Sequence, residues 1–420
     1  MIRRLLNYLK NPANNKIIEN IFSLGGLKAA TMLLPLIIIP HLIRSIGMEL
    51  VGLLAVVSSI SAYLRTLIDY GFVYTGTREV SRNNLNKEKN TYSFYIITYC
   101  KIILILISFF IILCLSLFIN FIHDNLILLI ISLANVSIAS LSPAWFFQGV
   151  EDMKKIAGGE VAGKIFSFFL IIFLVKDEKD ILFVPGFYLL GQLMSLAVYF
   201  IFLKKYIFLT HLPTFNVHDV KSKLIDGWSM FINILLPNFY NNYSYLAVGY
   251  FSNLSAVAAY DIIRKIMNIS EQAMGILSKV YYPSLASNFK RFSTFLRVIF
   301  VAAALLTILQ LVLSVIGTYL LKDSSIVIDP KLLYLQAIAP LIFAANLAYG
   351  INSLGVNNKD RQLRNITLAT SFIGFILVSL LTYYFAAFGA LSGVLLTMLI
   401  RAIICYKTSK SLNLYAYIRN

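Results

Sequence analysis

Apolar segments of membrane-spanning length recur along the whole sequence, and no other feature limits the possible folds as strongly. A helix needs about 20 apolar residues to cross the hydrocarbon core of a bilayer. Twelve segments meet this requirement, at approximate residues 17–44, 50–70, 92–119, 126–147, 159–175, 181–203, 228–251, 254–280, 295–321, 332–353, 366–385 and 390–407. Of the 420 residues, 59% are hydrophobic and only 13% are charged, too few polar groups to cover a soluble fold. The sequence therefore predicts an all-α integral membrane protein with about twelve transmembrane helices.

Basic residues are concentrated in alternate loops between these segments. The two termini and every second loop carry 23 Lys and Arg residues, whereas the opposite loops carry five, Arg44, Lys176, Lys179, Lys322 and Lys331. Because short loops rich in Lys and Arg stay on the cytoplasmic side, both termini are expected in the cytoplasm. Topology thus explains most of the net charge of +17, and no nucleic-acid partner is expected.

The longest hydrophilic segment between the predicted helices lies near the middle of the sequence, which suggests two six-helix lobes joined by a linker. The expected parts are a cytoplasmic or interfacial segment 1–16, an N-lobe 17–203, a cytoplasmic linker 204–227, a C-lobe 228–407 and a cytoplasmic tail 408–420. A faint similarity between residues 49–60 and 255–266, each at the start of the second helix of its half, favours a fold built from two repeats.

Charged residues inside the apolar segments are functional candidates, because an ion in lipid is costly unless it is paired or hydrated. Arg65 and Asp69 are four residues apart, so they share one helical face near the cytoplasmic end of the second segment. By count, Lys28 lies near the bilayer centre of the first segment. In the fifth segment, Lys164 can pair with Glu160 or extend to the cytoplasm.

Two further cations, Lys101 and Arg401, stand near segment ends, and both are expected to extend to the membrane surface. The eighth segment carries a polar stripe at steps of three and four residues: Asp261, Arg264, Lys265, Asn268, Glu271, Gln272, Gly275 and Lys279. Lipid cannot solvate such a stripe, so it must face a water-filled cavity or the other half of the protein. The alternative is a set of internal pairs, chiefly Asp261 with Lys265.

The seventh segment is unusually polar and aromatic, and its core contains Asn238, Tyr240, Asn241, Asn242 and Tyr243. Amide groups beside flat apolar rings suit sugars, although hydrogen bonds between helices would use the same residues. The sequence has no Walker-type phosphate loop, no HExxH or GxSxG motif and no cysteine–histidine cluster at metal-ligand spacing. We therefore expect a protein that is not an enzyme and that uses no cofactor or metal.

Four motifs resemble those of the Wzx-type O-antigen flippases, in the polysaccharide transporter branch of the multidrug/oligosaccharidyl-lipid/polysaccharide exporter superfamily. They are DYGF at 69–72, TREVS at 77–81, PAWFFQGVEDM at 143–153 and YYP at 281–283. The resemblance extends over essentially the whole chain. Asp69, Arg78, Trp145, Gln148 and Glu151 can be carried over as family signatures, without an assigned contact to substrate.

This resemblance implies a V-shaped arrangement of the two lobes around a central cavity lined by basic groups. It also implies the substrate, an oligosaccharide unit linked by pyrophosphate to undecaprenol, which is moved from the cytoplasmic to the periplasmic leaflet of the bacterial inner membrane for lipopolysaccharide biosynthesis. An O-antigen polymerase and a chain-length regulator are possible protein partners of such a flippase.

The expected mechanism is alternating access. Lys28, Arg65, Lys164, Arg264 and Lys265 would supply positive charge for the pyrophosphate, and Asn238, Tyr240, Asn241, Asn242 and Tyr243 would contact sugars. Proton or sodium coupling would use Asp69, Asp261 or Glu271. The alternatives are a multidrug or cation antiporter of the same superfamily and, from another class, a membrane enzyme such as a polymerase.

Overall fold

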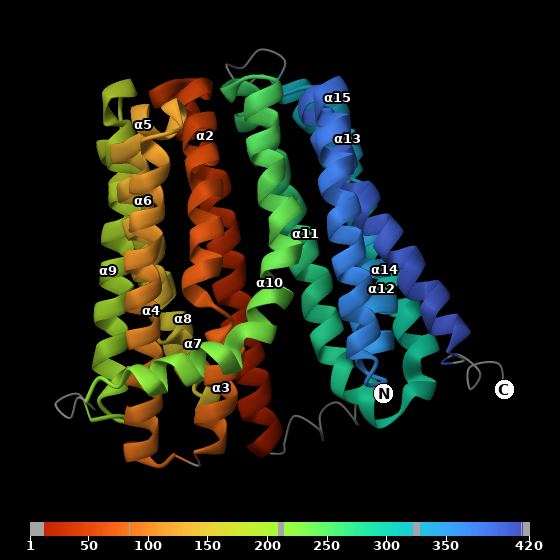
Figure 1. Ribbon diagram of the computed structural model, residues 1–420. Helices are drawn as coiled ribbons and strands as arrows, with labels where there is room; N and C mark the ends of the chain where they lie inside the picture. Colours follow the sequence, from red (N-terminus) through yellow and green to blue (C-terminus); the bar gives the residue numbers. More distant parts are fainter. Residues whose placement is uncertain (1–11, 84, 209–213, 322–327, 413, 415–420) are drawn as a thin grey trace. The chain divides into compact units, whose positions relative to one another are not determined.

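The computed structural model describes the backbone of residues 12–83, 85–208, 214–321, 328–412 and 414. It describes the side chains from Leu34 onward within these ranges, apart from positions 153, 154, 156, 157, 229, 233, 236, 237, 283, 286, 287, 320 and 321. Every regular element within these ranges is a helix, as the sequence predicts (Figure 1). Most of the predicted segment 1–16 lies outside the described residues.

Contacts within the chain are concentrated in two compact units. The first unit comprises the residues up to His41 together with Ser61–Ile234, and the second comprises Leu42–Ile60 and the residues from Leu235 onward. Residues 42–60, expected in the N-lobe, therefore group with the second unit. The last part of the expected linker, from residue 217, is helical and forms the first turns of α10 (Val217–Phe251) within the first unit.

The helices before the expected linker are separated by short turns. In chain order they are α2 (Pro12–Asp69), α3 (Phe72–Arg82), α4 (Lys87–Ser116), α5 (Asn120–Asp124), α6 (Leu126–Leu141), α7 (Ala144–Gly149), α8 (Met153–Leu174), η1 (Glu178–Leu182) and α9 (Phe183–Leu203). Within the first unit, α6 packs between α4 and α9 (Figure 1).

Small residues bring α8 and α9 into close contact. A Cβ atom on Gly163 would lie 2.1 Å from the carbonyl oxygen of Gly191, and one on Gly191 would lie 2.1 Å from Oγ of Ser167. Apolar side chains gain little from one another in lipid, so close packing of small residues is a main source of helix association there. Gly163 and Gly191 therefore allow α8 and α9 to pack closely.

The second unit is built from the C-terminal helices. They are α10 from Leu235 onward, followed by α11 (Leu254–Ser287), η2 (Phe289–Arg291), α12 (Phe292–Leu321), α13 (Pro330–Gln336), α14 (Ala339–Asn346), the π-helix η3 (Leu347–Gly355) and α15 (Asp360–Ser411). Its interior contains polar contacts, such as the hydrogen bond of 2.8 Å from the Tyr260 hydroxyl to Oγ of Ser244.

Two long helices are interrupted where the sequence places a gap between predicted spans. Gly47 interrupts α2 with φ of 81°, a left-handed conformation that glycine adopts without steric cost. Ala386 interrupts α15 with φ of 48°, which is strained for a residue with a Cβ atom. Each break divides its helix at the boundary between two predicted segments.

All twelve predicted segments fall on helical elements. Within the part of the chain that the structure describes, seven stretches could cross a membrane by length and composition: Leu34–Arg82, Lys87–Ser116, Leu126–Gly149, Glu178–Leu203, Phe289–Tyr319, Pro330–Gly355 and Asp360–Ser411. The first and last, with 49 and 52 residues, contain the breaks in α2 and α15. The helices α8, α10 and α11, where the fifth, seventh and eighth spans were predicted, are not among the seven.

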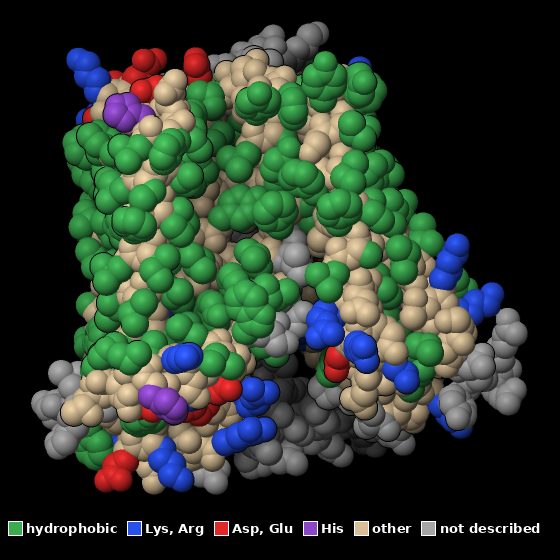
Figure 2. Space-filling model, in the orientation of Figure 1, with side chains coloured by type: hydrophobic (Ala, Val, Ile, Leu, Met, Phe, Trp, Pro, Cys, Tyr) green, Lys and Arg blue, Asp and Glu red, His purple; other side chains and the backbone are tan. Residues whose placement is uncertain are grey.

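Large hydrophobic side chains cover the outside of the first unit. Figure 2 shows them along its helices, with charged and histidine side chains gathered at the two ends. Leu106, Phe110, Phe173 and Ile201 are among the exposed ones. An apolar surface of this extent is stable in lipid and not in water, so the chain is a multi-pass membrane protein.

Candidate functional site

A network of charged side chains joins three helices in the first unit. Nε of Arg65 lies 3.4 Å from Oδ2 of Asp69, and Nζ of Lys101 lies 3.4 Å from Oδ1 of the same carboxylate. Lys101 comes from α4 and also donates a hydrogen bond to the carbonyl oxygen of Ser140 at the end of α6. Arg65 and Asp69, which the sequence places on one helical face, thus form an ion pair that a third charge extends.

The expectation that Lys101 extends to the membrane surface is wrong. Its side chain is only 3% exposed, whereas that of Arg65 is 52% exposed. An ammonium group at this depth must be solvated by protein, and Asp69 and the Ser140 carbonyl provide the acceptors. Spacing along one helix does not reveal this contact, because the partners of Lys101 lie 32 and 39 residues away in the chain.

The half-buried Lys164 of α8 belongs to the same region. It is near enough to Glu160, one turn earlier, and to Arg65 to interact with both electrostatically. We call Arg65, Asp69, Lys101, Glu160 and Lys164 the N-unit charge cluster, which holds three cations and two carboxylates. Arg65 and Lys164, two of the residues predicted to bind the pyrophosphate, are thus close to each other. The side chain of Lys28 lies outside the described residues.

Arg264 is the most unusual group of the second unit. It is only 6% exposed, and Nη2 donates a hydrogen bond of 3.1 Å to Oδ1 of Asn241. Its Nε and Nη1 have no hydrogen-bond partner in the part of the chain that the structure describes. The hydroxyl groups of Tyr240, Tyr245 and Tyr260 lie within electrostatic range. Buried donors without acceptors are costly, so Nε and Nη1 are available to donate hydrogen bonds to an anion.

The other charges of the α11 stripe are arranged differently. Asp261 and Lys265 form an ion pair of 2.5 Å between Oδ2 and Nζ, the internal pair that the sequence also allowed. Glu271 is exposed, and it lies within electrostatic range of Arg264 and of Arg401 on α15. The stripe therefore contains one neutralised pair, one buried cation with two donors that have no partner among the described residues, one exposed carboxylate and one exposed cation, Lys279.

Several residues of the α10 run bond to neighbouring helices. The Tyr243 hydroxyl accepts a hydrogen bond of 2.9 Å from Ser379, and its ring centroid lies 4.5 Å from that of Phe375. The backbone carbonyl of Asn242 accepts a hydrogen bond of 2.8 Å from Ser59. Tyr240 is buried, whereas Asn238, Asn241 and Asn242 are half-buried. These contacts agree with the interhelical role, and the sugar contacts stay a prediction.

The signature motifs at 77–81 and 143–153 pack against each other. Thr77 donates a hydrogen bond of 2.8 Å to the carbonyl of Trp145, and a Cβ atom on Gly76 would meet the Trp145 ring at 2.7 Å. Gln148 and Glu151, in contrast, are exposed. The motifs therefore join α3 to α7.

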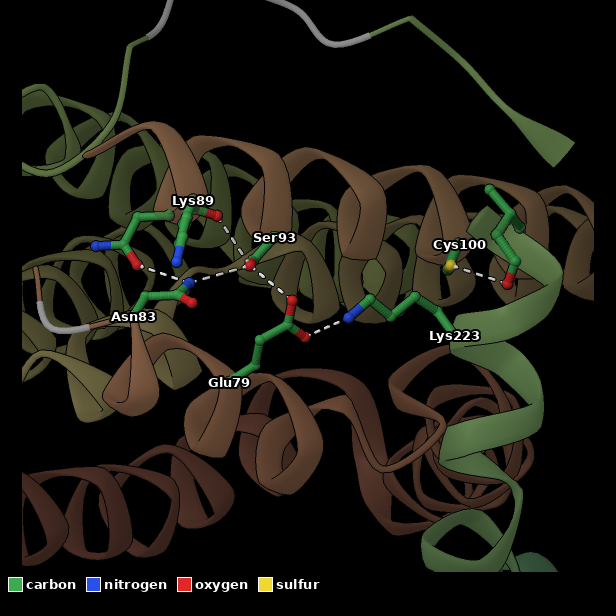
Figure 3. A network of polar contacts seen from close by, with 8 residues as sticks. Glu79, Asn83, Lys89, Ser93, Cys100 and Lys223 are labelled. Carbon is green, nitrogen blue, oxygen red and sulfur yellow. Dashed lines mark hydrogen bonds and ion pairs between the residues drawn. The ribbon is translucent and has the colours of Figure 1, made fainter. Parts of the chain in front are cut away.

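Glu79 connects this region to the start of α10, as Figure 3 shows. Its carboxylate accepts from Nζ of Lys223 through Oε2 and from Oγ of Ser93 through Oε1, the latter at 2.7 Å. Asn83 in turn donates to Oγ of Ser93 at 3.2 Å. The contact of Glu79 could not be predicted from the sequence, because its ionic partner lies 144 residues away.

Among the residues that the structure describes, no three His, Cys, Asp or Glu side chains gather where they could hold a metal ion. The three cysteines, Cys100, Cys114 and Cys405, are free. The candidate residues of the first unit offer fixed positive charge, and those of the second unit offer a buried cation, amide groups and aromatic rings.

Comparisons with known proteins are consistent with these features. The sequence matches the family described as "Polysaccharide biosynthesis protein" over residues 17–289. It is 24% identical over 400 residues to a protein named "Putative O-antigen transporter" from Escherichia coli (strain K12), covering 90% of this chain and 93% of the relative.

Solved structures with the same fold include membrane transporters. An inward-facing multidrug resistance MATE family transporter of the MOP superfamily has a TM-score of 0.68 at 11% identity, covering 93% of this chain and 96% of that one. The lipid II flippase MurJ, in an inward closed conformation, has a TM-score of 0.66 at 12% identity, covering 93% of this chain and 89% of that one. At these identities the likeness shows the fold alone.

Proposed function

Because the chain belongs to the polysaccharide biosynthesis protein family, we propose that it is a flippase for a lipid-linked oligosaccharide. The substrate is an O-antigen unit joined by pyrophosphate to undecaprenol, and it moves from the cytoplasmic to the periplasmic leaflet of the bacterial inner membrane. The relative named "Putative O-antigen transporter", which the chain matches over 90% of its length, supports this substrate class.

The buried guanidinium of Arg264 carries the proposal. A pyrophosphate cannot cross about 30 Å of hydrocarbon unless protein groups replace its hydration. Arginine binds phosphate oxygens through parallel N–H donors, and Nε and Nη1 of Arg264 are two adjacent donors without partners among the described residues. Since the side chain is 6% exposed, an alternating-access cycle would uncover it during only part of transport.

The N-unit charge cluster supports the same substrate. Asp69 is already bonded to Arg65 and Lys101, so the cluster keeps a net positive charge while each carboxylate has a cation nearby. Lys164 and the half-exposed Arg65 are the members that we assign to the head group. Lys28 and Lys265 are assigned the same role, and Asn238, Tyr240, Asn241, Asn242 and Tyr243 are assigned to sugars.

The driving force is only partly electrical. An anionic head group that moves outward follows the inside-negative potential, which is worth about 2.3 kcal/mol per charge per 100 mV. Asp69 and Asp261 are held in ion pairs, whereas Glu271 forms none among the described residues. Of the three carboxylates expected to couple protons or sodium, Glu271 is therefore the best placed. The proposed topology keeps twelve spanning helices with both termini in the cytoplasm.

The test is complementation of a strain that lacks the gene. We expect the deletion to accumulate undecaprenyl-linked single units on the cytoplasmic face and the wild-type chain to restore polymer. Arg264→Gln should restore less than a tenth of the polymer at equal protein level, because each charge-assisted hydrogen bond is worth about 1.5–3 kcal/mol. Arg264→Lys should be intermediate, and Arg364→Gln, which removes an exposed arginine of α15, should behave as wild type.

Two results would count against the proposal. Full activity of Arg264→Gln would remove its main support. Normal polysaccharide combined with drug sensitivity in the deletion strain would instead favour the multidrug exporter, whose fold the chain shares. A cavity with excess positive charge disfavours organic cations, and this is why the exporter is the second candidate.

A further inference from the structure

A cavity of about 330 Å3 lies between α3, α4 and the first turns of α10, all within the first unit. Its lining includes Arg78, Glu79, Arg82, Asn83, Lys223 and Asp226. Three of these six come from the TREVS motif region of α3, to which the proposed function assigns no role. The volume falls within the range of about 300–1,000 Å3 that is common for small-molecule sites.

Two of the cations in this cavity have no ionic partner among the described residues. Arg78 and Arg82 are four residues apart, so they project from the same face of α3. Both are exposed, and the described part of the chain places no carboxylate within 4 Å of either guanidinium. Their donors therefore line the cavity without an ionic acceptor from the residues that the structure describes.

The third cation is held in a fixed position. Nζ of Lys223 pairs with Glu79, whose other oxygen accepts a hydrogen bond of 2.7 Å from Ser93. Glu79 thus neutralises the charge of Lys223 and positions its ammonium group, while Asp226 is exposed. The cavity holds three cations against two carboxylates, and one of these carboxylates is already neutralised.

The part of α10 that carries Lys223 is held in place by contacts with α4 and with the residues between α2 and α3. Near the cavity, Sγ of Cys100 lies 3.8 Å from the carbonyl oxygen of Val220. Farther along α10, the Phe231 ring stacks on Tyr70 with a centroid distance of 4.7 Å, and a Cβ atom on Gly71 would meet Met230 at 2.8 Å. The site is therefore organised before any ligand arrives, which lowers the entropic cost of binding.

We propose that this cavity binds a phosphate group at the cytoplasmic end of the first unit. Arg78 and Arg82 contact the phosphate oxygens, Lys223 adds a third charge, and Glu79 acts as a positioning residue. Two guanidinium forks can bind different oxygen atoms of one phosphate group, whereas a single carboxylate has only two oxygen atoms to share between them. The inference deepens the proposed function, on which it rests, because the pyrophosphate of the lipid-linked substrate is one source of the group and an anionic phospholipid is the other.

The experiment measures binding to the purified full-length protein in neutral detergent. One arm titrates inorganic pyrophosphate by calorimetry, and the other uses native mass spectrometry to count retained phosphatidylglycerol against retained phosphatidylcholine. Arg78→Gln/Arg82→Gln should weaken at least one of the two ligands tenfold or more. Lys89→Gln/Lys221→Gln removes the same charge from two exposed lysines that do not line the cavity, and it should bind as wild type.

The arm that responds identifies the source of the phosphate. Loss of pyrophosphate binding alone favours the substrate head group, and loss of phosphatidylglycerol alone favours a phospholipid. Glu79→Gln should weaken the same ligand less than the double arginine variant does, because it releases Lys223 without removing a cation. Equal losses in the arginine and lysine variants, or no loss in either arm, would overturn the proposal.

Binding and complementation together distinguish an incorrect assignment of this cavity from an incorrect proposed function. If the cavity binds no phosphate while the chain still flips substrate, Arg78→Gln/Arg82→Gln complements fully and Arg264→Gln does not. If the chain is not a flippase, the wild type fails to complement while the loss of binding in the arginine variant persists.

Discussion

Replacing Lys101 by methionine tests whether the N-unit charge cluster is held together by its buried member. Methionine keeps the length of the side chain and removes the ammonium, which leaves the Asp69 carboxylate and the Ser140 carbonyl without their shared donor. Breaking a buried ion pair by removing one partner costs about 3–5 kcal/mol. Asp69 keeps Arg65 and is 25% exposed, so the expected loss of folding free energy is lower, about 2–4 kcal/mol.

Arg65→Gln is the matched control, because it removes the other cation from the same carboxylate. The Arg65 side chain is 52% exposed and its pair with Asp69 is 3.4 Å long, so the loss should be below about 1 kcal/mol. Both losses can be measured by reversible unfolding of the detergent-solubilised protein in sodium dodecyl sulfate. If Arg65→Gln costs as much as Lys101→Met, burial does not decide the strength of these pairs and the reasoning is refuted.

Two further predictions concern packing and a tyrosine outside the membrane spans. Gly163→Ala would place a Cβ atom 2.1 Å from the Gly191 carbonyl oxygen and should reduce the stability of the fold by at least about 1–3 kcal/mol. Gly158→Ala is the control and should leave the stability unchanged, because a Cβ atom there would have no atom within 4 Å. Equal melting temperatures of the two variants would contradict the close contact. Burial, with the hydrogen bond of 2.9 Å to Asp152, raises the pKa of Tyr206 to about 12 from 10.0. The neutral phenol therefore stabilises the fold below pH 10, and this contribution is lost as the pH rises toward 12. Melting temperatures between pH 9 and pH 12 should fall less steeply for Tyr206→Phe than for the wild type, and parallel curves would exclude the effect.

The fold class followed from the sequence because a bilayer leaves little choice. A backbone in hydrocarbon must satisfy its hydrogen bonds within its own segment or in a closed barrel, so apolar segments of about 20 residues become helices. The breaks at Gly47 and Ala386 lie in the gaps that the sequence predicts. The ion pairs of Arg65 with Asp69 and of Asp261 with Lys265 were also predictable, since both join residues one turn apart.

Contacts between helices were not predictable in the same way. Lys101 was expected at the surface, yet it is buried because Asp69 and Ser140, on other helices, accept its hydrogen bonds. The pair of Glu79 with Lys223 joins residues 144 apart, and it turns part of an expected linker into the wall of a cavity. The grouping of residues 42–60 with the second unit is a further example.

The physical reason is the range of the interactions. Hydropathy and i, i+4 spacing act along one helix, so the sequence by itself determined the helices, their approximate ends and the pairs within them. Which helix faces which, and therefore whether a charge such as Arg264 lies buried with unpaired donors or reaches solvent, depends on packing among segments far apart in the chain. Only the tertiary structure decided that.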